Sequence, residues 1–558
     1  MGVILQATYK LPGGHTVPSP FDGNRRTPWW WDHIAAQANA FRQAGFTAIW
    51  LPPALKTNAG AFPGADGYGP FDDYDLGSKN QFFSTPTRFG PRERLQRCTA
   101  IMRANGIDVY LDTVLHHRDG GNNFVYRYKG ADGAAGIGRF PKDPKCFFPN
   151  VPRDPIAGPV TDDFGFGDEL APINAQPKGY VHDGLIDAVD WQTRALDAQG
   201  YRLDDTKGLA VGFVNSFLNS KAMAGKFAVG EYFDGNPDTL NWWVWNSGMN
   251  GRASTFDFGL RFALAGMCSN GGRWNMAQLD HLGYAGRDPA HAVTFVENHD
   301  TDLNSPIIWN KLLAYAYILT SEGYPCVYYK DYSTDPGCYG LKDDITNLVW
   351  IHEHLANGFT EYRWKDFQFV VYERLGWPNL LVGLNNDIFN GWKTVTVQTG
   401  FGPNVQLHDY SGHAGDVWTD AQGNVTIGIP QNTNGLGYVC YSRADLSKPN
   451  AVQRHATTQV FEGAADLDIG PAIAGTDTII GRIWCDSGFP VELKPESTAP
   501  HLTFSLNDPA GNPVAIEGGK GHTEARGWHT LMVNSSATGS TAFRLAVTYT
   551  STQHLGGG

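Results

Sequence analysis

Eight short apolar segments recur between residues 3 and 332, and helical patterns separate most of them. Near-continuous apolar strands that alternate with helices are typical of a parallel sheet covered on both faces. Eight such units predict an α/β fold, a (β/α)8 TIM barrel, whose active site lies at the carboxyl ends of the strands. The expected strands are residues 3–10, 46–53, 107–117, 200–207, 227–233, 254–260, 292–300 and 324–332.

Helical periodicity and stop signals define the segments between these strands. One helix is expected over residues 29–45, because Gly45 is typical of a helix end. The others are expected near residues 91–105, 183–199, 209–225, 304–321 and 342–357.

Three further parts interrupt or follow the barrel, which takes residues 1–117 and 181–360. Residues 118–180 hold many Gly, Pro, Asp and Phe and no clear helix, and we expect an inserted domain B there. Residues 361–445 alternate in short strands and predict an antiparallel β domain C. Residues 455–555 predict a C-terminal β-sandwich that folds separately.

The composition is that of a globular protein and argues against some classes of partner. Hydrophobic residues make up 42% and charged residues 18% of the chain, so extended disorder is not expected. The net charge of −13 argues against nucleic acid. Neither a run of like charges nor an apolar segment long enough for a bilayer is present. We therefore expect no nucleic-acid or membrane partner. A monomer is our expectation for the oligomeric state.

The seven cysteines show neither C-x-x-C spacing nor a zinc pattern, and the odd count leaves at least one unpaired. One or two disulfides in loops stay open as alternatives. The first residues, MGVIL, lack the charged segment of a signal peptide. We expect a secreted protein whose signal peptide is absent from this sequence, with a cytoplasmic protein as the alternative.

Polar side chains gather at the ends of four expected strands. Arg202 and Asp204 are two residues apart, so they share one face of a strand, and a cation beside a carboxylate favours its ionised, nucleophilic form. Such a pair alone is more often a structural ion pair. The whole set is larger and comprises Asp112, His117, Arg202, Asp204, Lys207, Glu231, His299 and Asp300. Carboxylates flanked by His and Arg donors suit glycoside hydrolysis.

Five ordered stretches resemble motifs of the α-amylase family, glycoside hydrolase family 13. Residues 112–117 (DTVLHH) resemble D-x-V-x-N-H, and residues 200–207 (GYRLDDTK) resemble G-x-R-x-D-x-x-K. Residues 230–233 (GEYF) and 295–300 (FVENHD) resemble the third and fourth regions. Residues 67–76 (GYGPFDDYDL) resemble G-Y-x-x-x-D-x-Y-D-L. The resemblance covers residues 1 to about 445.

The resemblance implies a role for each matching residue. Asp204 would be the nucleophile, Glu231 the acid and base, and Asp300 the group that grips the hydroxyls of the distorted sugar. Substrate would also be bound by Tyr68, stacked under that sugar, by the donors His117, His299 and Arg202, and by Lys207 beyond the cleaved bond. A retaining mechanism predicts that the carboxyl groups of Asp204 and Glu231 lie about 5–5.5 Å apart.

The chain departs from the family where a structural calcium ion is expected. His116 replaces an asparagine ligand, and Pro172 replaces an aspartate in residues 170–174 (LAPIN). Calcium takes six to eight oxygen ligands, which an imidazole does not supply. Asp168 and the Gly208 carbonyl could replace them, together with Asp162 and Asp163. A solvated acidic loop is the alternative, so we expect calcium to bind weakly or not at all.

These observations predict endo-acting, retaining hydrolysis of α-1,4-glucosidic bonds in starch and related α-glucans. Two alternative activities within the family remain: the protein is an exo-acting maltooligosaccharide-forming enzyme, or it is an α-glucan transglycosylase. A glycan-binding protein without catalysis is an alternative of another class. The sandwich lacks catalytic motifs, so we expect it to be dispensable for soluble oligosaccharides. Trp484 and Trp528 there are expected to pack in its core or to contact granular starch.

Overall fold

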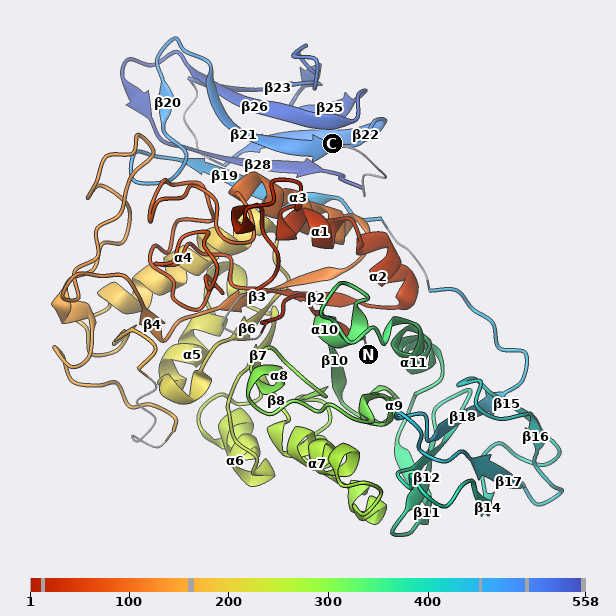
Figure 1. Cartoon of the computed structure of the whole chain (residues 1–558). Helices are drawn as coiled ribbons and strands as arrows, with labels where there is room; N and C mark the ends of the chain where they lie inside the picture. Colours follow the sequence, from red (N-terminus) through yellow and green to blue (C-terminus); the bar gives the residue numbers. More distant parts are fainter. Residues whose placement is uncertain (1, 12–15, 159–164, 451–453, 497–500, 553–558) are drawn as a thin grey trace. The chain divides into compact units, whose positions relative to one another are not determined.

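The computed structural model describes residues 2–11, 16–158, 165–450, 454–496 and 501–552 (Figure 1). The chain forms two compact units. The first unit comprises Met1–Leu11, Phe41–Ile49 and Val229–Ala451, and the second comprises Pro12–Ala40, Trp50–Ala228 and Val452–Gly558.

Eight parallel strands form one closed barrel in the order β1-β10-β9-β8-β7-β6-β3-β2, which confirms the predicted fold class. The strands are β1 (Ile4–Gln6), β2 (Ala48–Leu51), β3 (Asp108–Thr113), β6 (Gly200–Leu203), β7 (Phe227–Gly230), β8 (Ser254–Phe256), β9 (Ala292–Phe295) and β10 (Tyr324–Tyr328). Each lies inside its predicted segment. Nearly all of their residues are buried, as expected for parallel strands covered by helices.

The predicted helices are present in the predicted order with shifted bounds. The helices are α1 (Trp30–Ala35), α2 (Ala38–Ala44), α3 (Arg92–Ala104), α4 (Tyr180–Leu196), α5 (Val211–Leu218), α6 (Pro237–Asn241), α7 (Phe258–Ser269), α8 (Thr301–Asn304), α9 (Lys311–Thr320), α10 (Tyr329–Tyr332) and α11 (Lys342–His354). Of these, α6, α7, α8 and α10 are helices that the sequence did not predict. The single helix predicted over residues 29–45 is two helices, and at the break the Gln37 side chain donates to the His33 carbonyl at 3.3 Å. Helix α7 begins inside the strand predicted to residue 260, because the Asp257 side chain accepts the Leu260 N–H at 2.9 Å and caps the helix.

The prediction that His117 ends the third strand was wrong. Strand β3 ends at Thr113, and His117 begins β4 (His117–Arg118), which pairs antiparallel with β5 (Asp168–Glu169). The apolar residues Val114 and Leu115 continue the strand pattern beyond the end of the strand itself. His117 therefore belongs to the small ribbon at the base of the inserted residues.

The region expected to form domain C contains a six-stranded sheet in the order β11-β12-β13-β18-β15-β16 and a two-stranded ribbon, β14-β17. Their bounds are β11 (Thr360–Lys365), β12 (Phe369–Arg374), β13 (Leu380–Asn385), β14 (Lys393–Gln398), β15 (Gln406–Asp409), β16 (Val417–Trp418), β17 (Asn424–Ile429) and β18 (Tyr438–Arg443). Alternate residues of β14 and β17, such as Val395 and Ile427, pack into one core with β12, β13 and β18.

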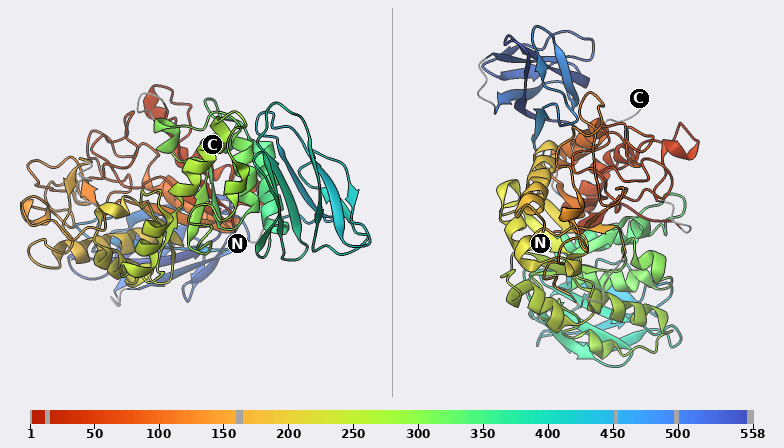
Figure 2. Two further views of the ribbon diagram at one scale, coloured as in Figure 1. Left: turned by 90° about the horizontal axis from the view of Figure 1, so that it is seen from below. Right: turned by 90° about the vertical axis from the view of Figure 1, so that its left-hand side faces the viewer.

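The C-terminal residues form the expected antiparallel sandwich, with a five-stranded sheet β19-β28-β22-β25-β24 facing a three-stranded sheet β21-β26-β23. Its strands are β19 (Thr457–Gly463), β20 (Ala472–Ile473), β21 (Thr478–Cys485), β22 (Phe489–Pro495), β23 (Leu502–Asn507), β24 (Ile516–Glu517), β25 (Lys520–Thr523), β26 (Gly527–Ser535), β27 (Ser540–Thr541) and β28 (Phe543–Tyr549). Its core also includes Ala100 of α3. Figures 1 and 2 show strand β19 beside helices α3 and α4 of the same compact unit.

Trp484 and Trp528 join the sandwich to helix α3. Their rings meet edge to face with centroids 5.5 Å apart. The Arg97 guanidinium lies 4.7 Å from the Trp484 ring, and that of Arg94 lies 5.0 Å from the Trp528 ring. Cation–π contacts of this kind favour docking of the sandwich on the helix. They are a third use for the two tryptophans, different from the core packing and the starch contacts that the sequence suggested.

All seven cysteines are free, so the structure has no loop disulfide among them. Within the described ranges, no helix combines the length and the apolar character needed to cross a membrane.

Candidate active site

Strands β3 and β6 of the second compact unit bring three charged groups together. The two strands pair so that Asp112 lies opposite Arg202, and Asp204 follows the last residue of β6. Arg202 Nη1 donates to Asp112 Oδ1 at 2.8 Å and to Asp204 Oδ1 at 2.6 Å. The predicted pair of Arg202 and Asp204 is therefore present, and a second buried carboxylate shares the same nitrogen.

Asp112 is the centre of a larger hydrogen-bond network. Its Oδ2 accepts from the Tyr68 hydroxyl at 2.6 Å and from Trp50 Nε1 at 2.9 Å. The Arg202 guanidinium lies over both rings, 5.1 Å from Trp50 and 5.5 Å from Tyr68. Burial raises the pKa of Asp112 to about 6, Arg202 opposes this rise, and the charge of Asp204 adds to it. The network thus fixes Tyr68 and Trp50 around a carboxyl group that can change its charge near neutral pH.

His117 is tied to the same loop as Tyr68. Its Nε2 lies 2.7 Å from the Tyr68 carbonyl oxygen, which can only accept, so Nε2 carries the proton. Burial lowers the pKa of His117, although the nearby charge of Asp204 acts in the opposite direction. A neutral His117 therefore donates a hydrogen bond to the Tyr68 backbone and lies near the Asp204 carboxylate.

Lys207 lies in a 3-10 turn, Thr206–Gly208, directly after the Asp204 segment. A Cβ atom placed on Gly158 would come within 2.3 Å of Lys207 Cγ. The stem of Lys207 therefore lies against the backbone of the inserted residues, and only a glycine at position 158 leaves room for it.

The first compact unit carries Glu231, His299 and Asp300. Glu231 follows the last residue of β7, while His299 and Asp300 lie in the loop after β9. His299 Nε2 lies 3.2 Å from Asp300 Oδ2. Gln6 Nε2 donates to His299 Nδ1 at 2.8 Å, so the Nε2 proton of His299 faces the Asp300 carboxylate.

Two residues at this position were missed by sequence reasoning. Gln6 is the last residue of β1, and Lys10 lies four residues further along the chain. Lys10 Nζ contacts Asp300 Oδ1 at 3.1 Å. The only local signal was a polar residue at the end of an apolar strand, which indicates a barrel site but not its partner.

The three expected catalytic carboxylates belong to different units. Asp204 lies in the second unit, and Glu231 and Asp300 lie in the first. The assignment of all three to one catalytic centre, with 5–5.5 Å between the carboxyl groups of Asp204 and Glu231, stays a prediction.

At the expected calcium position, the described residues lack the side-chain oxygens of an asparagine at 116 and an aspartate at 172. Asp168 Oδ2 accepts the Tyr126 hydroxyl at 2.8 Å. The space beside Gly208 is filled by Asp205 Oδ2 and the His116 ring, 2.6 Å and 2.7 Å from where a Cβ would lie. Burial lowers the pKa of His116 to about 3, so its imidazole is neutral. No group of three His, Cys, Asp or Glu side chains that could hold a metal occurs among the residues described. Asp162 and Asp163 lie outside them.

Comparisons with known proteins agree with the motifs and the fold. The family model "Alpha-amylase C-terminal" matches residues 380–442. The chain is 27% identical over 473 residues to a glucan 1,4-alpha-maltohexaosidase of Bacillus sp. (strain 707), covering 75% of this chain and 88% of that protein. It is 27% identical over 510 residues to an alpha-amylase of Geobacillus stearothermophilus, covering 78% and 89%.

The fold is also similar to a solved structure over nearly the whole of both chains. The crystal structure of γ-CGTase from alkalophilic Bacillus clarkii matches 99% of this chain and 97% of its own, with 15% identity and a TM-score of 0.58. The closed parallel barrel, the β domains that follow it and these relatives lead to one conclusion. The chain is a glycoside hydrolase, and its fold and its curated relatives are those of the α-amylase family.

Proposed function

We propose that the protein hydrolyses α-1,4-glucosidic bonds of starch and related α-glucans by endo attack, with retention of anomeric configuration. The observation that carries this proposal is the Arg202 nitrogen shared by Asp112 and Asp204 at the carboxyl end of β6. In the strand order, β7 with Glu231 behind it is the neighbour of β6. Two carboxyl groups that follow adjacent strands suit double displacement.

The proposed reaction has two steps. Asp204 attacks the anomeric carbon and forms a glycosyl ester, while Glu231 gives its proton to the departing glycosidic oxygen. Glu231 then takes a proton from water, whose oxygen attacks the same carbon and releases Asp204. Arg202 holds Oδ1 of Asp204, which leaves Oδ2 as the attacking atom. Asp300, oriented by Lys10 and His299, would bind hydroxyl groups of the reacting sugar.

The stereochemistry tests this mechanism directly. Proton NMR of freshly cleaved maltooligosaccharide should show the α-anomer first, and β-anomer as the first product would overturn retention. Asp204→Asn and Glu231→Gln should each abolish hydrolysis while the circular dichroism and melting temperature stay close to those of the wild type. Full activity in either variant would contradict the assigned roles.

The mode of attack needs a separate measurement. One relative is named for a maltohexaose product, so exo-like release of one oligosaccharide is the second candidate. Early long oligosaccharides from soluble starch support endo attack, and a single dominant product supports the exo alternative. Chains longer than the substrate would indicate transglycosylation, and absence of cleavage with retained glucan binding would indicate a glycan-binding protein.

The remaining parts of the proposal concern partner and location. We propose an α-glucan as the substrate of a monomer that acts outside the cell. Size-exclusion chromatography with light scattering and fractionation of the native host test these two points. A stable dimer would contradict the monomer, and activity confined to the cytoplasm would contradict secretion.

A further inference from the structure

The loop between β19 and β20 of the sandwich reaches two segments outside it. This acidic loop (residues 464–469) is closed by hydrogen bonds from the Ala464 N–H to the Ile469 carbonyl at 2.9 Å and from the Leu467 N–H to the Ala464 carbonyl at 3.2 Å. Leu467 is fully buried. Asp466 and Asp468 therefore project from a loop whose backbone is already held.

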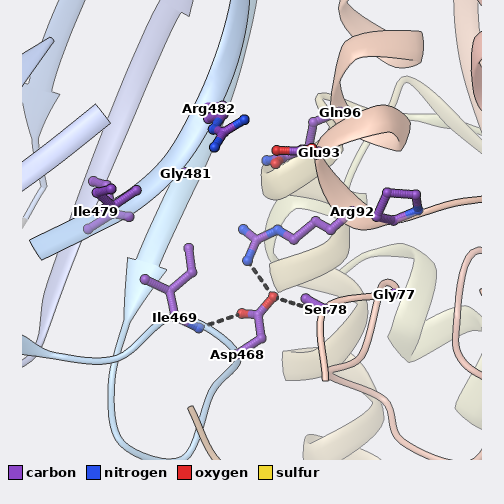
Figure 3. Close-up of a pocket in the computed structure, with 12 residues that line it drawn as sticks. Gly77, Ser78, Arg92, Glu93, Gln96, Asp468, Ile469, Ile479, Gly481 and Arg482 are labelled. Atoms are coloured by element: carbon purple, nitrogen blue, oxygen red, sulfur yellow. Dashed lines mark hydrogen bonds and ion pairs between the residues drawn. The ribbon is translucent and has the colours of Figure 1, made fainter. Parts of the chain in front are cut away.

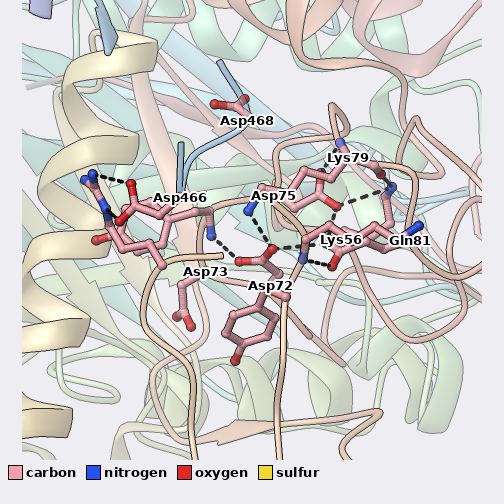
Figure 4. A network of polar contacts seen from close by, with 12 residues as sticks. Lys56, Asp72, Asp73, Asp75, Lys79, Gln81, Asp466 and Asp468 are labelled. Atoms are coloured by element: carbon pink, nitrogen blue, oxygen red, sulfur yellow. Dashed lines mark hydrogen bonds and ion pairs between the residues drawn. The ribbon is translucent and has the colours of Figure 1, made fainter. Parts of the chain in front are cut away.

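Asp466 binds the inserted residues through Arg139. Arg139 Nε and Nη2 donate to the two carboxylate oxygens of Asp466, each at 2.9 Å. The Arg139 backbone N–H also donates to the Asp466 carbonyl at 2.9 Å, and Nη1 reaches Glu462 Oε1 at 2.9 Å. A paired fork of this kind fixes orientation as well as distance. Figure 4 shows Asp466 in this network.

Asp468 binds both the Gly-rich segment (residues 67–81) and Arg92, the first residue of α3. Its Oδ2 accepts from the Ser78 hydroxyl at 2.6 Å and from Arg92 Nη1 at 2.5 Å (Figure 3). The Asp468 side chain is fully buried, and Oδ1 accepts the Ile469 N–H at 3.0 Å. Because both oxygens accept from buried or half-buried donors, an amide in place of this carboxylate would turn its own NH₂ towards a donor.

The two segments held by the acidic loop also meet each other through buried charges. Lys142 of the inserted residues donates to Asp73 Oδ2 at 2.5 Å. Asp73 also accepts from Arg118 Nε at 3.1 Å, and Asp75 Oδ1 accepts the backbone N–H groups of Ser78 and Gly77. The Gly-rich segment and the inserted residues thus form one charged network, which the acidic loop closes from the sandwich side.

This network ends at two expected substrate-binding residues. Arg118 directly follows His117, and its hold on Asp73 fixes the backbone of His117. Tyr68 lies in the Gly-rich segment, where its carbonyl accepts from His117 and its hydroxyl donates to Asp112. We propose that the acidic loop of the sandwich is a positioning element that holds the Tyr68 segment and the His117 segment in the geometry that binds the glucan.

The positioning role, which rests on the proposed function, can be separated from simple docking of the sandwich. Docking uses other contacts on α3 and α4, including Gln459 Nε2 to Thr99 Oγ1 at 3.0 Å and the ion pair of Glu496 with Arg194. The Glu496 side chain pairs with Arg194 of helix α4, whereas Asp466 contacts Arg139 of the inserted residues and Asp468 contacts Ser78 and Arg92. Glu496→Gln is therefore a matched control that removes a sandwich ion pair away from the acidic loop.

The test compares two variants of the full chain by hydrogen–deuterium exchange. One is the double variant with Asp466→Asn and Asp468→Asn, and the other is the control Glu496→Gln. We expect the double variant to exchange faster in peptides covering residues 67–81 and 126–142, with helix α5 unchanged, and the control to match the wild type. The exchange readout does not depend on catalysis, so it stands even if the wild type cleaves no glucan. Unchanged exchange in both segments would overturn the proposal.

A kinetic readout links positioning to the substrate. With maltoheptaose, at a temperature well below the melting temperature of each variant, kcat/KM of the double variant should fall about tenfold, equal to about 1.4 kcal/mol. The control should change less than about twofold. The swap Arg139→Asp with Asp466→Arg should recover part of the loss of Asp466→Arg alone. Equal kcat/KM in the double variant and the control, with all proteins folded, would also overturn the proposal.

Discussion

At the scale of single residues, one arginine nitrogen organises the site around Asp204. Arg202 Nη1 donates to Asp112 and Asp204 at once, and Asp112 in turn orients Tyr68 and Trp50. Hydrogen bonds to a charged group contribute more than neutral ones, and loss of one partner leaves the others unpaired. The side chains around Asp112 therefore act as one unit.

The charge of Asp112 predicts a pH dependence. Because its pKa is raised to about 6, it gains a proton as the pH falls through 6 and no longer attracts Arg202 as an anion. We expect an acid limb of kcat/KM near pH 6, which Asp112→Asn should remove. In that variant an NH₂ group faces either Arg202 or the Tyr68 and Trp50 donors, so kcat/KM at pH 7 should fall about tenfold or more. An acid limb that is the same in both proteins would contradict the assignment.

Substitution of Lys10 should affect substrate binding less than substitution of Asp112. It contacts Asp300 at 3.1 Å, and the two side chains are 16% and 42% exposed, so solvent screening limits the contribution. Lys10→Met should raise KM up to about fivefold, about 1 kcal/mol, with kcat nearly unchanged, and Lys10→Arg should restore the wild-type value. Steady-state kinetics on a short maltooligosaccharide check this, and a loss confined to kcat would contradict it.

At the scale of elements, the inserted residues are attached by buried charges. Asp73 accepts from Arg118 and Lys142, and each of these three side chains is at most 2% exposed. Burial would raise the pKa of Asp73, but Arg118 and Lys142 together hold it at about 2. Removal of one partner from such a cluster lowers the free energy of unfolding more than loss of a surface ion pair does, because the remaining charge stays buried.

Lys142→Met should therefore destabilise the protein strongly. We expect the free energy of unfolding to fall by about 3–5 kcal/mol and the melting temperature to fall by on the order of 10 °C. Lys129→Met is the control, since Lys129 donates to the Asn80 carbonyl at the exposed edge of the same segment. Because the pKa of Asp73 is lowered, its contribution is present above the unfolded pKa near 4 and is lost as the pH falls towards 2. Equal melting of the two variants at pH 7 would refute this account.

At the scale of the whole chain, the sandwich is joined to the barrel more extensively than the sequence suggested. Ala100 of helix α3 belongs to the sandwich core, and Gln459 donates to the Gln96 carbonyl at 2.9 Å. A chain that ends near residue 447 would expose these groups of α3 and free Arg92 from Asp468. We therefore expect lowered stability for such a chain, while the dispensability of the sandwich for cleaving soluble oligosaccharides stays a prediction.

At the scale of the whole chain, stability should also be independent of calcium. His116 offers a ring nitrogen where an oxygen is expected, and Asp168 already accepts from Tyr126, so the expected oxygen ligands are incomplete. Thermal melting should therefore change little on addition of a chelator, and starch hydrolysis should continue. A fall of many degrees that calcium alone reverses would demonstrate an intact, tight site and would contradict the expectation.

Local pattern was enough to predict the barrel and the positions of its strands. Apolar runs with polar ends mark β3, β6, β7 and β9, and the Arg-x-Asp spacing places Arg202 beside Asp204, because residues two apart share a strand face. The same reasoning overextended β3 to His117, since Val114 and Leu115 continue the apolar pattern without a strand partner.

What the sequence alone determined is therefore the order of the strands, the sandwich that follows them and the side chains at the strand ends. Tertiary structure decided which groups far apart in the sequence meet. Gln6 and His299 are 293 residues apart, Lys10 and Asp300 are 290 apart, and Ser78 and Asp468 are 390 apart. The physical reason is that strand and helix periods act over a few residues, whereas a buried polar group finds its partner only when the packed chain excludes water around it.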